Sequence, residues 1–252
     1  MSFDLIHGDC GDILPTIDDK SVDAIICDLP YSLTDCKWDS EIFSTWLFSE
    51  YFRITKKNAP IILFASQPFT SVLVYEHMKD FKYEWIWVKN AGSNFGTLKY
   101  NPMKEHESVL VFSNGGGKTT YNPIMQQRSE SGLKRVKTIV NYNTTAEVYG
   151  KGKLVGDNKV SSKRPDLRYP SSVQYFNRER GYHPTQKPLD LLMYLVKTYT
   201  NEDELVLDNC MGSGTTGVAC KNLNRKFIGI EKEKKYYDIS VNRCKLLEKV
   251  LK

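Results

Sequence analysis

The sequence contains no apolar run long enough to cross a membrane. A bilayer span takes roughly 20 consecutive apolar residues, and the apolar stretches, such as residues 60–65, are far shorter. The first ten residues, MSFDLIHGDC, have neither a basic start nor a long apolar segment, so they do not resemble a cleaved secretion signal. We therefore expect a cytoplasmic protein without a membrane partner.

Cysteine is sparse, and no pattern of metal ligands is present. The six cysteines of the 252-residue chain include no CxxC pair and no Cys/His cluster with the spacing of zinc ligands. We predict reduced thiols and no metal site. Hydrophobic residues make up 40% of the chain and charged residues 26%. This composition is too apolar for a disordered protein, and the length fits one α/β domain with one large insertion.

The basic residues are concentrated in one segment. The whole chain has a formal charge of +5, but residues 114–182 contain 13 Lys and Arg against 5 Asp and Glu, a net charge of +8. Tyrosines lie between these charges. The combination suits a nucleic acid, whose phosphates attract cations and whose bases stack on aromatic rings. Because the segment is also rich in Gly, Ser and Asn and shows little periodicity, a solvated flexible insertion is the other interpretation.

Outside that segment, apolar runs alternate with stretches of helical periodicity. This pattern is typical of a parallel sheet whose strands are linked by crossover helices. The predicted strands are residues 4–6, 24–27, 61–64, 84–88, 108–112, 205–208 and 226–230. The predicted helices are residues 42–53, 68–79, 188–199, 215–222 and 234–251.

A glycine-rich turn follows one of the predicted strands. The run ELVLDNCMGSGTTGVAC contains GxGxxG at Gly212, Gly214 and Gly217, and the next predicted strand leads to Glu231, 19 residues after the first glycine. An acid at that distance can accept hydrogen bonds from both hydroxyls of an adenosine ribose. Asp208 would repel a pyrophosphate at the helix N-terminus but attract the sulfonium of S-adenosylmethionine. The loop therefore favours S-adenosylmethionine over NAD.

A second motif follows the apolar run at residues 24–27. Asp28, Leu29, Pro30 and Tyr31 bring together a carboxylate, a backbone carbonyl held by the following proline, and an aromatic ring. The carboxylate and the Leu29 carbonyl can each accept one hydrogen of an exocyclic amine while the tyrosine stacks on its ring. Such contacts would leave the nitrogen lone pair available for attack. An ordinary turn after a strand is the alternative interpretation.

Together the two motifs resemble those of the amino-methylating DNA methyltransferases. That family carries a DPPY, NPPY or SPPY catalytic motif and a glycine motif of the DPFxGSGTT type; here they read DLPY at residues 28–31 and DNCMGSGTT at residues 208–216. The order, with the catalytic motif first, resembles the β class. HPTQKP at residues 183–188 and GDC at residues 8–10 match further elements of the same class.

The resemblance implies a fold and a domain organisation. We expect an α/β, Rossmann-like S-adenosylmethionine-dependent methyltransferase sheet with helices on both faces. Residues 1–113 would form the catalytic half, residues 114–182 an inserted target-recognition region, and residues 183–252 the cofactor-binding half. The basic, aromatic segment thus falls where the family places its target-recognition region.

The resemblance also implies roles for individual residues. The catalytic motif would be Asp28, Leu29, Pro30 and Tyr31. The residues expected to bind S-adenosylmethionine are Asp9, Cys10, His183, Thr185, Lys187, Asp208, Gly212, Ser213, Gly214, Thr215 and Glu231. Within this set Glu231 would meet the ribose, Asp9 the adenine and Lys187 the methionine carboxylate. The residues expected to bind duplex DNA are Lys134, Arg135, Lys137, Lys151, Lys153, Lys163, Arg164 and Arg168.

Three positions depart from the family pattern. Leu29 replaces the first proline, but it keeps the backbone carbonyl on which the proposed role depends. Asn209 and Cys210 replace proline and phenylalanine in the glycine motif. The ring that often packs on the cofactor adenine is therefore missing at position 210.

The activity implied is site-specific methyl transfer from S-adenosylmethionine to the exocyclic N6 of adenine in duplex DNA, by base flipping and direct displacement. An Asp-first motif usually accompanies adenine, so N4-cytosine methylation is the alternative, as is RNA adenine N6-methylation. A nicotinamide-dependent oxidoreductase would leave DLPY unexplained, and a non-catalytic DNA-binding protein would not need it. A C5-cytosine enzyme is excluded, because its Pro-Cys nucleophile is absent. A homodimer and a cognate restriction endonuclease are further partners that the resemblance admits.

Overall fold

The computed structural model describes residues 3–30, 41–137 and 166–250. The chain divides into two compact units, one formed by Met1–Asn122 with Ser172–Lys252 and the other by Pro123–Ser171. The first unit contains an eight-stranded sheet in the order β1-β10-β9-β2-β3-β5-β4-β8. Its strands are β1 (Phe3–His7), β2 (Ala24–Cys27), β3 (Pro60–Ala65), β4 (Phe81–Ser93), β5 (Lys104–Ser113), β8 (Val173–Tyr175), β9 (Leu205–Asp208) and β10 (Lys226–Glu231).

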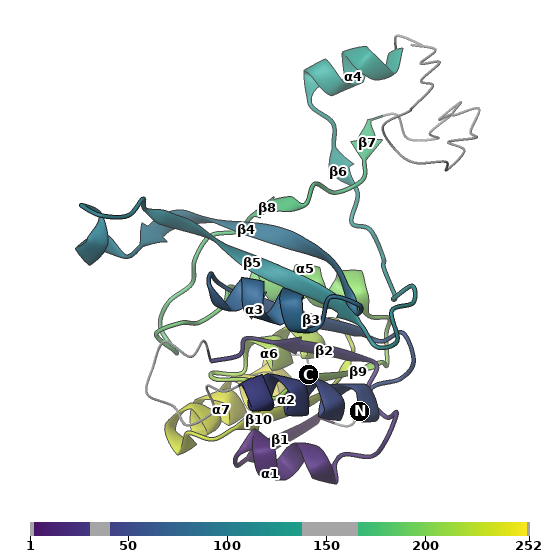
Figure 1. Ribbon diagram of the computed structural model, residues 1–252, viewed down its shortest axis with the longest axis vertical. Helices are drawn as coiled ribbons and strands as arrows, with labels where there is room; N and C mark the ends of the chain where they lie inside the picture. The colour runs from purple at the N-terminus through teal and green to yellow at the C-terminus, as the bar shows by residue number, and fades with distance from the viewer. Residues whose placement is uncertain (1–2, 31–40, 138–165, 251–252) are drawn as a thin grey trace. The chain divides into compact units, whose positions relative to one another are not determined.

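The sheet is parallel except at β5. This strand runs antiparallel to β3 and to β4, whereas the other neighbouring strands pair in parallel. The prediction of a parallel sheet is therefore wrong at this strand. Only residues 94–103 connect β4 to β5, and a parallel pair needs a crossover of a dozen or more residues. The two strands instead form the long hairpin visible in Figure 1.

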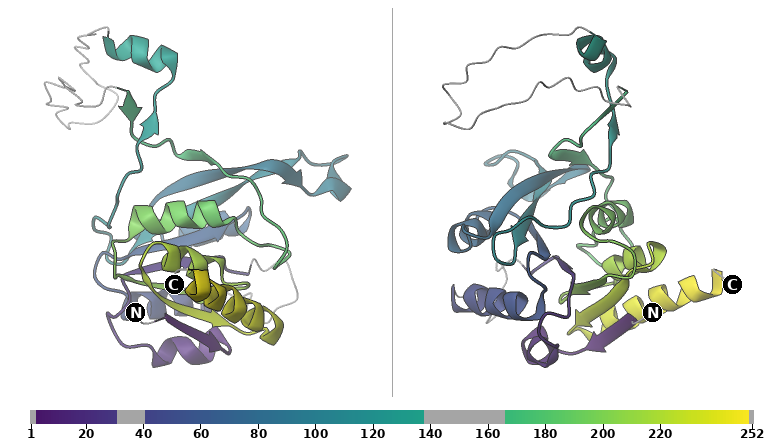
Figure 2. Two further views of the ribbon diagram at one scale, coloured as in Figure 1. Left: turned by 180° about the vertical axis from the view of Figure 1, so that it is seen from behind. Right: turned by 90° about the vertical axis from the view of Figure 1, so that its right-hand side faces the viewer.

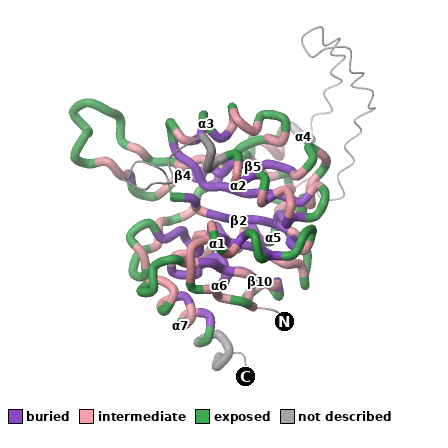
Figure 3. The backbone as a smooth tube through the Cα atoms, turned by 60° about the horizontal axis from the view of Figure 1, so that its bottom comes forward, coloured by how far each residue is buried: buried purple, intermediate pink, exposed green. Residues whose placement is uncertain are grey.

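Helices cover both faces of this sheet (Figure 2). On one face, α2 (Glu41–Ile54), α3 (Phe69–Glu76) and the short α1 (Cys10–Ile13) with η1 (Leu14–Thr16) pack over a core that includes Ile25 and Cys27 of β2. On the other face lie α5 (Leu189–Tyr199), α6 (Thr215–Asn222) and α7 (Lys234–Val250), over a core that includes Ile26. Successive side chains of a strand point to opposite faces, so β2 is buried throughout (Figure 3).

Each predicted strand and helix is present; β2, β9 and α6 have the predicted bounds, and the ends of the others differ by one or more residues. The largest difference is β4, predicted as residues 84–88 and observed as Phe81–Ser93. None of the helices in the described ranges has the length and apolar character of a transmembrane span. The structure adds elements that were not predicted, namely α1, η1, β8, η2 (Phe95–Thr97), β6 (Gln126–Gln127), α4 (Glu130–Lys137) and β7 (Leu167–Arg168).

The strand order reverses between β9 and β2. From β9 the chain proceeds through α6 to β10 on one side, and from β2 it proceeds through α2 to β3 on the other. The loops at the carboxyl ends of the two strands therefore diverge, and such a switch point is where open α/β sheets bind ligands. Asp28 follows β2 directly, and Asp208 ends β9. The fold thus brings the two predicted motifs to one edge of the sheet.

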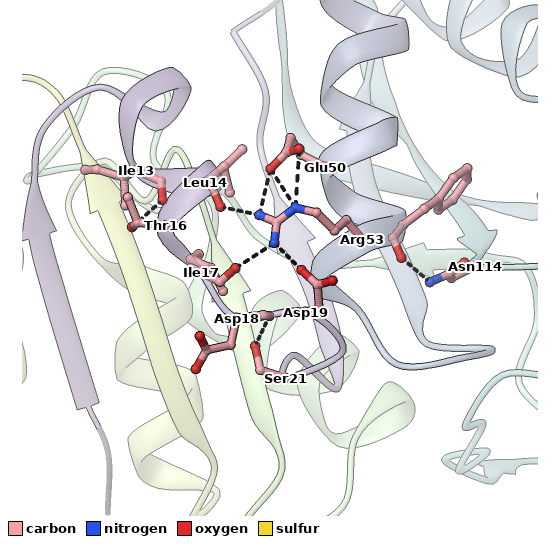
Figure 4. Close-up of polar contacts among 11 residues, drawn as sticks. Ile13, Leu14, Thr16, Ile17, Asp18, Asp19, Ser21, Glu50, Arg53 and Asn114 are labelled. Atoms are coloured by element: carbon pink, nitrogen blue, oxygen red, sulfur yellow. Dashed lines mark hydrogen bonds and ion pairs between the residues drawn. The ribbon is translucent and has the colours of Figure 1, made fainter.

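Arg53 ties α2 to the segment between β1 and β2 (Figure 4). Its guanidinium donates to the backbone carbonyls of Leu14 (2.9 Å) and Ile17 (2.8 Å) and pairs with the carboxylates of Glu50 and Asp19. Planar guanidinium groups suit such divergent acceptors because their donors form a rigid fork. The contact holds the connection that leads into β2, the strand that carries the DLPY motif.

The second unit, Pro123–Ser171, contains fewer residues than the predicted insertion at residues 114–182. Within it, β6 and β7 pair antiparallel, with Gln126 opposite Arg168, and the Arg128 side chain donates from Nε to the Leu167 carbonyl (2.9 Å). Residues 173–175 instead form β8, which pairs with β4 in the first unit. Asn122 also belongs to the first unit, where its backbone N–H donates to the Thr198 carbonyl (2.7 Å).

Candidate active site

The DLPY motif begins where β2 emerges from the core. Asp28 retains partial exposure, whereas the side chain of Leu29 is buried in the core that contains α2. The leucine that departs from the family pattern therefore anchors the turn through its side chain and leaves its backbone in the loop. Pro30 is exposed, and Tyr31 lies outside the described residues.

Lys187 lies against Asp28. Its Nζ pairs with Oδ2 of Asp28 and is 3.6 Å from Oε2 of Glu107, and its side chain is only 8% exposed. Burial alone would lower the pKa of Lys187, but attraction by Asp28 and Glu107 outweighs it and raises the pKa. The ammonium is therefore charged at neutral pH. The resemblance implied a role for Lys187 at the methionine carboxylate; in the structure its described partners are the two protein carboxylates.

His183 and Thr185 form a turn beside the glycine loop. The Thr185 backbone N–H donates to Nδ1 of His183 (3.2 Å), and the imidazole packs on the Tyr236 ring with 4.1 Å between centroids. A β-carbon at Gly212 would lie 3.8 Å from the same imidazole. Burial lowers the pKa of His183 despite the nearby Asp28 carboxylate, so the ring is neutral at neutral pH. Thr185 is exposed.

The glycine loop depends on two left-handed residues. Gly212 has φ of +53° and Gly214 has φ of +76°. Residues with a β-carbon rarely adopt this backbone conformation. A β-carbon at Gly214 would also lie 2.7 Å from Cβ of Ser240 on α7. The lack of a side chain at Gly214 therefore lets the loop pack directly on α7, and no other residue fits there.

Asp208 holds this loop from within. Its Oδ2 accepts from the Thr216 hydroxyl (2.6 Å) and its Oδ1 from the Cys210 backbone N–H (3.2 Å). Burial raises the pKa of Asp208 to about 7, although the hydrogen bond from Thr216 opposes the shift. The sequence predicts that this carboxylate attracts the sulfonium of the cofactor. In the structure both of its oxygens accept hydrogen bonds inside the loop, because the side chain is buried beneath it.

Glu231 and Asp9 lie at the ends of neighbouring strands. The Gly212 backbone N–H donates to Oε2 of Glu231 (2.9 Å), and Gly8 donates to the Glu231 carbonyl (3.0 Å). Asp9 accepts from the Gly11 backbone N–H (2.8 Å) and pairs with Lys232 (2.9 Å). Burial disfavours the ionised form of Asp9, but the hydrogen bonds from Lys232 and Gly11 and the charge of Lys232 together outweigh it and lower the pKa. The two predicted adenosine-binding acids are thus adjacent.

The departures at positions 209 and 210 have a structural basis. Asn209 is buried, and its Oδ1 accepts from the buried Tyr51 hydroxyl (2.6 Å). Cys10 and Cys210 pack beside the core that contains Cys27, and burial raises the pKa of Cys27 to about 12. Among the described residues the cysteines are free thiols, and no cluster has the arrangement of a metal site.

Two residues of the site were not predicted. Arg243 of α7 donates to the carbonyl (2.8 Å) and hydroxyl (3.0 Å) of Ser213 and to the Thr215 hydroxyl (2.9 Å), so it clamps the glycine loop. Glu107 of β5 lies beside Lys187. Neither residue belongs to a motif, and both reach the site through tertiary packing. The only available signal was the position of Arg243 on a predicted helix.

The predicted DNA-binding residues fall largely outside the described part of the chain. Lys151, Lys153, Lys163 and Arg164 lie outside the described residues. Lys134 is exposed on α4, and Arg168 is exposed on β7. Arg135 and Lys137 also belong to α4, but their side chains are not among those described.

Comparison with known proteins identifies the family. Residues 22–242 match the family model described as DNA methylase (N6_N4_Mtase), so the chain belongs to this family. It is 29% identical over 245 residues to the type II methyltransferase M.HpaI of Haemophilus parainfluenzae, covering 91% of this chain and 70% of that protein. It is 28% identical over 253 residues to the DNA adenine methyltransferase YhdJ of Escherichia coli K12, covering 95% and 81%. The crystal structure of the M1.HpyAVI–SAM complex matches with a TM-score of 0.66 and 25% identity, covering 96% of this chain and 98% of that chain.

These findings confirm the predicted family, fold class and cofactor. The chain is a β-class amino-methylating DNA methyltransferase that uses S-adenosylmethionine, and a nicotinamide-dependent oxidoreductase is excluded. The site fits the cofactor, because the partly exposed Gly212 has no side chain to block the loop and two acids, Asp9 and Glu231, flank it at neighbouring strand ends. Acidic side chains in this position suit the hydroxyls of an adenosine ribose.

The raised pKa of Asp208 predicts a pH-dependent stability. In the folded protein this pKa is about 7, against an ordinary value of 3.8, so the folded state binds the proton more tightly than the unfolded chain. The stability contributed by the neutral carboxyl is fully present below about pH 4 and is lost as the pH rises to about 7. Asp208→Asn removes this titration. Between about pH 5 and about pH 8, we expect the unfolding free energy of the wild type to fall by about 2.5 kcal/mol more than that of the variant.

Urea denaturation of both proteins at the two pH values measures this difference. The other titrating groups are present in both proteins, so their contributions cancel when the two are compared. The same fall in both proteins would show that Asp208 does not titrate in this range.

Proposed function

We propose that the chain transfers the methyl group to N6 of adenine in duplex DNA. The observation that carries the proposal is the position of Asp28, which follows a buried strand at the switch point, next to the strand that ends in the glycine loop. An Asp-first catalytic motif and the similarity to a protein described as a DNA adenine methyltransferase support adenine. N4-cytosine methylation and RNA adenine methylation are the competing activities.

Asp28 and Leu29 would hold the target amine. The carboxylate and the backbone carbonyl each accept one amine hydrogen, which orients the nitrogen lone pair away from both acceptors. Lys187 pairs with Oδ2 of Asp28 and fixes the orientation of the carboxylate. A flipped base reaches this position at a cost of a few kcal/mol in lost stacking, which stacking on Tyr31 would partly offset.

The cofactor-binding residues of the proposal are those of the glycine loop and the neighbouring strand ends. Glu231 would accept from the ribose hydroxyls and Asp9 would face the adenine, while Gly212, Ser213, Gly214 and Thr215 form the loop around the remainder. When bound, S-adenosylmethionine supplies an electrophilic methyl group. Binding both reactants in line replaces a bimolecular encounter with an oriented one. After transfer, the nitrogen would lose a proton, and the Asp28 carboxylate that is proposed to hold the amine would be positioned to accept it.

The proposal is tested by identifying the methylated nucleoside. The protein is incubated with radiolabelled S-adenosylmethionine and mixed-sequence duplex DNA, with structured RNA in parallel, and the products are digested and separated. We expect label in N6-methyladenine from DNA. Label in N4-methylcytosine would overturn the choice of base, and label only in RNA would overturn the choice of polymer.

The role of Asp28 is tested by Asp28→Ala. Because the variant loses an acceptor for the target amine, we expect kcat to fall by about 100-fold or more, while the Kd for S-adenosylmethionine measured by calorimetry stays within about threefold. Asp18→Ala, at an exposed loop position, is the matched control and should retain wild-type kcat. Near-normal turnover by Asp28→Ala would refute the catalytic assignment.

The basic segment is tested through the salt dependence of DNA binding. Each phosphate contact contributes about 0.9 to the slope of log K against log salt concentration. If Lys134 and Arg168 contact phosphates, the double variant Lys134→Ala/Arg168→Ala should lower the magnitude of this slope by about 2. Lys57→Ala, at an exposed site in the first unit, is the control. An unchanged slope in the double variant would favour the solvated-insertion interpretation.

The homodimer, the cognate endonuclease and the cytoplasmic location stay predictions.

A further inference from the structure

Four charged side chains form a row that ends at Asp28. Lys187 pairs through Nζ with Oδ2 of Asp28 and lies 3.6 Å from Oε2 of Glu107, whose Oε1 pairs with Lys89. The charges therefore alternate in sign along the row. The side chains of Lys187, Glu107 and Lys89 are 8%, 15% and 7% exposed. Water screens these charges weakly, so each depends on its neighbours.

The topology of the sheet explains how these residues meet. On β5, Ser108 pairs with Ala65, the last residue of β3. Because β5 is antiparallel to β3, Glu107 continues just beyond the carboxyl end of β3, at the edge where Asp28 lies. Lys89 is on β4, the other strand of the hairpin, and Lys187 precedes α5. The hairpin thus contributes charge directly to the catalytic edge.

Glu107 has an unused acceptor beside Lys187. Its buried Oε2 has no hydrogen-bond partner among the described residues, and the 3.6 Å separation from Nζ of Lys187 exceeds hydrogen-bond length. Burial disfavours the charged form of Glu107, but attraction by Lys187 and Lys89 outweighs it and lowers the pKa. Lys187 is therefore hydrogen-bonded to one carboxylate and attracted electrostatically by a second.

We propose that Glu107 is a positioning residue for methyl transfer, which shares the ammonium of Lys187 with Asp28 so that Asp28 is oriented but still able to accept the target amine. This inference rests on the proposed catalytic role of Asp28. Without the charge of Glu107, the buried ammonium would be left with Asp28 as its carboxylate partner and would occupy it more fully. The described contacts of Glu107 are with Lys89 and Lys187, not with the glycine loop, so cofactor binding should be unaffected.

The test separates charge from shape at position 107. Glu107→Gln removes the charge and keeps the size, and we expect kcat to fall about tenfold or more, with KM and Kd for S-adenosylmethionine within about twofold of wild type. Glu107→Asp keeps the charge and should recover most of kcat. Glu105→Gln is the matched control, because it makes the same change at an exposed position two residues earlier on β5, and it should leave kcat unchanged.

A double variant tests whether Glu107 acts through Lys187. If it does, Glu107→Gln should cost nothing further in a Lys187→Met background, since coupled residues are non-additive. The inference would be overturned if the fold decreases in kcat of the two single variants multiply in the double variant. It would also be overturned if Glu107→Gln has the wild-type kcat. Thermal unfolding and cofactor binding verify folding, and Glu107→Met is the second neutral variant if Glu107→Gln is unstable, because apolar residues often replace buried ions without loss of stability.

The wild-type protein in the same assay distinguishes the two hypotheses. If the wild type methylates DNA and Glu107→Gln has the same kcat, the role of Glu107 is refuted and the proposed function is not. A wild type that transfers no methyl group to a nucleic acid refutes the proposed function, and with it this inference.

Discussion

The pairing of β2 with β9 is the constraint on which the site depends. These strands are far apart in the sequence, yet Ala24 pairs with Val206 and Ile25 with Leu207 in parallel register. Asp23 strengthens the junction, since its carboxylate accepts from the Leu205 backbone N–H (2.9 Å). In a parallel pair both carboxyl ends reach the same edge, so this register alone brings the DLPY motif beside the glycine loop. Neither half forms the site without the other.

The acids gathered at this edge are stabilised in different ways, and their chemistry differs accordingly. Asp208 is buried against a hydroxyl and a backbone amide, which do not offset its desolvation, and its pKa rises to about 7. Asp9 pairs with Lys232, and its pKa falls. Asp28 has a buried ammonium beside it. In the proposed site, which would bind a cationic cofactor next to an uncharged base, Asp208 would serve the structure of the loop, Asp9 the cofactor and Asp28 the target amine.

Local patterns predicted the parts of the site that depend on local chemistry. The sequence predicts the apolar strand before Asp28 and the glycine turn before α6, because a buried strand and a left-handed turn each require particular residue types. The partner of Lys187 and the role of Arg243 were not predictable, since each depends on elements brought together by packing. The alternation of strands and helices does not predict the antiparallel β5, whose direction follows from the short connection between β4 and β5.

The departures from the family motifs fall at positions where the proposed role depends on the backbone and not on the side chain. Leu29 would contribute a carbonyl, which any residue supplies, and its side chain fills the core. Cys210 occupies a loop whose conformation is fixed elsewhere, by the left-handed Gly214 against Ser240 and by Arg243 across Ser213. A side chain can change at such a position as long as the loop conformation does not. Replacing Gly214 is a different matter, because any β-carbon there collides with α7 and displaces the loop itself.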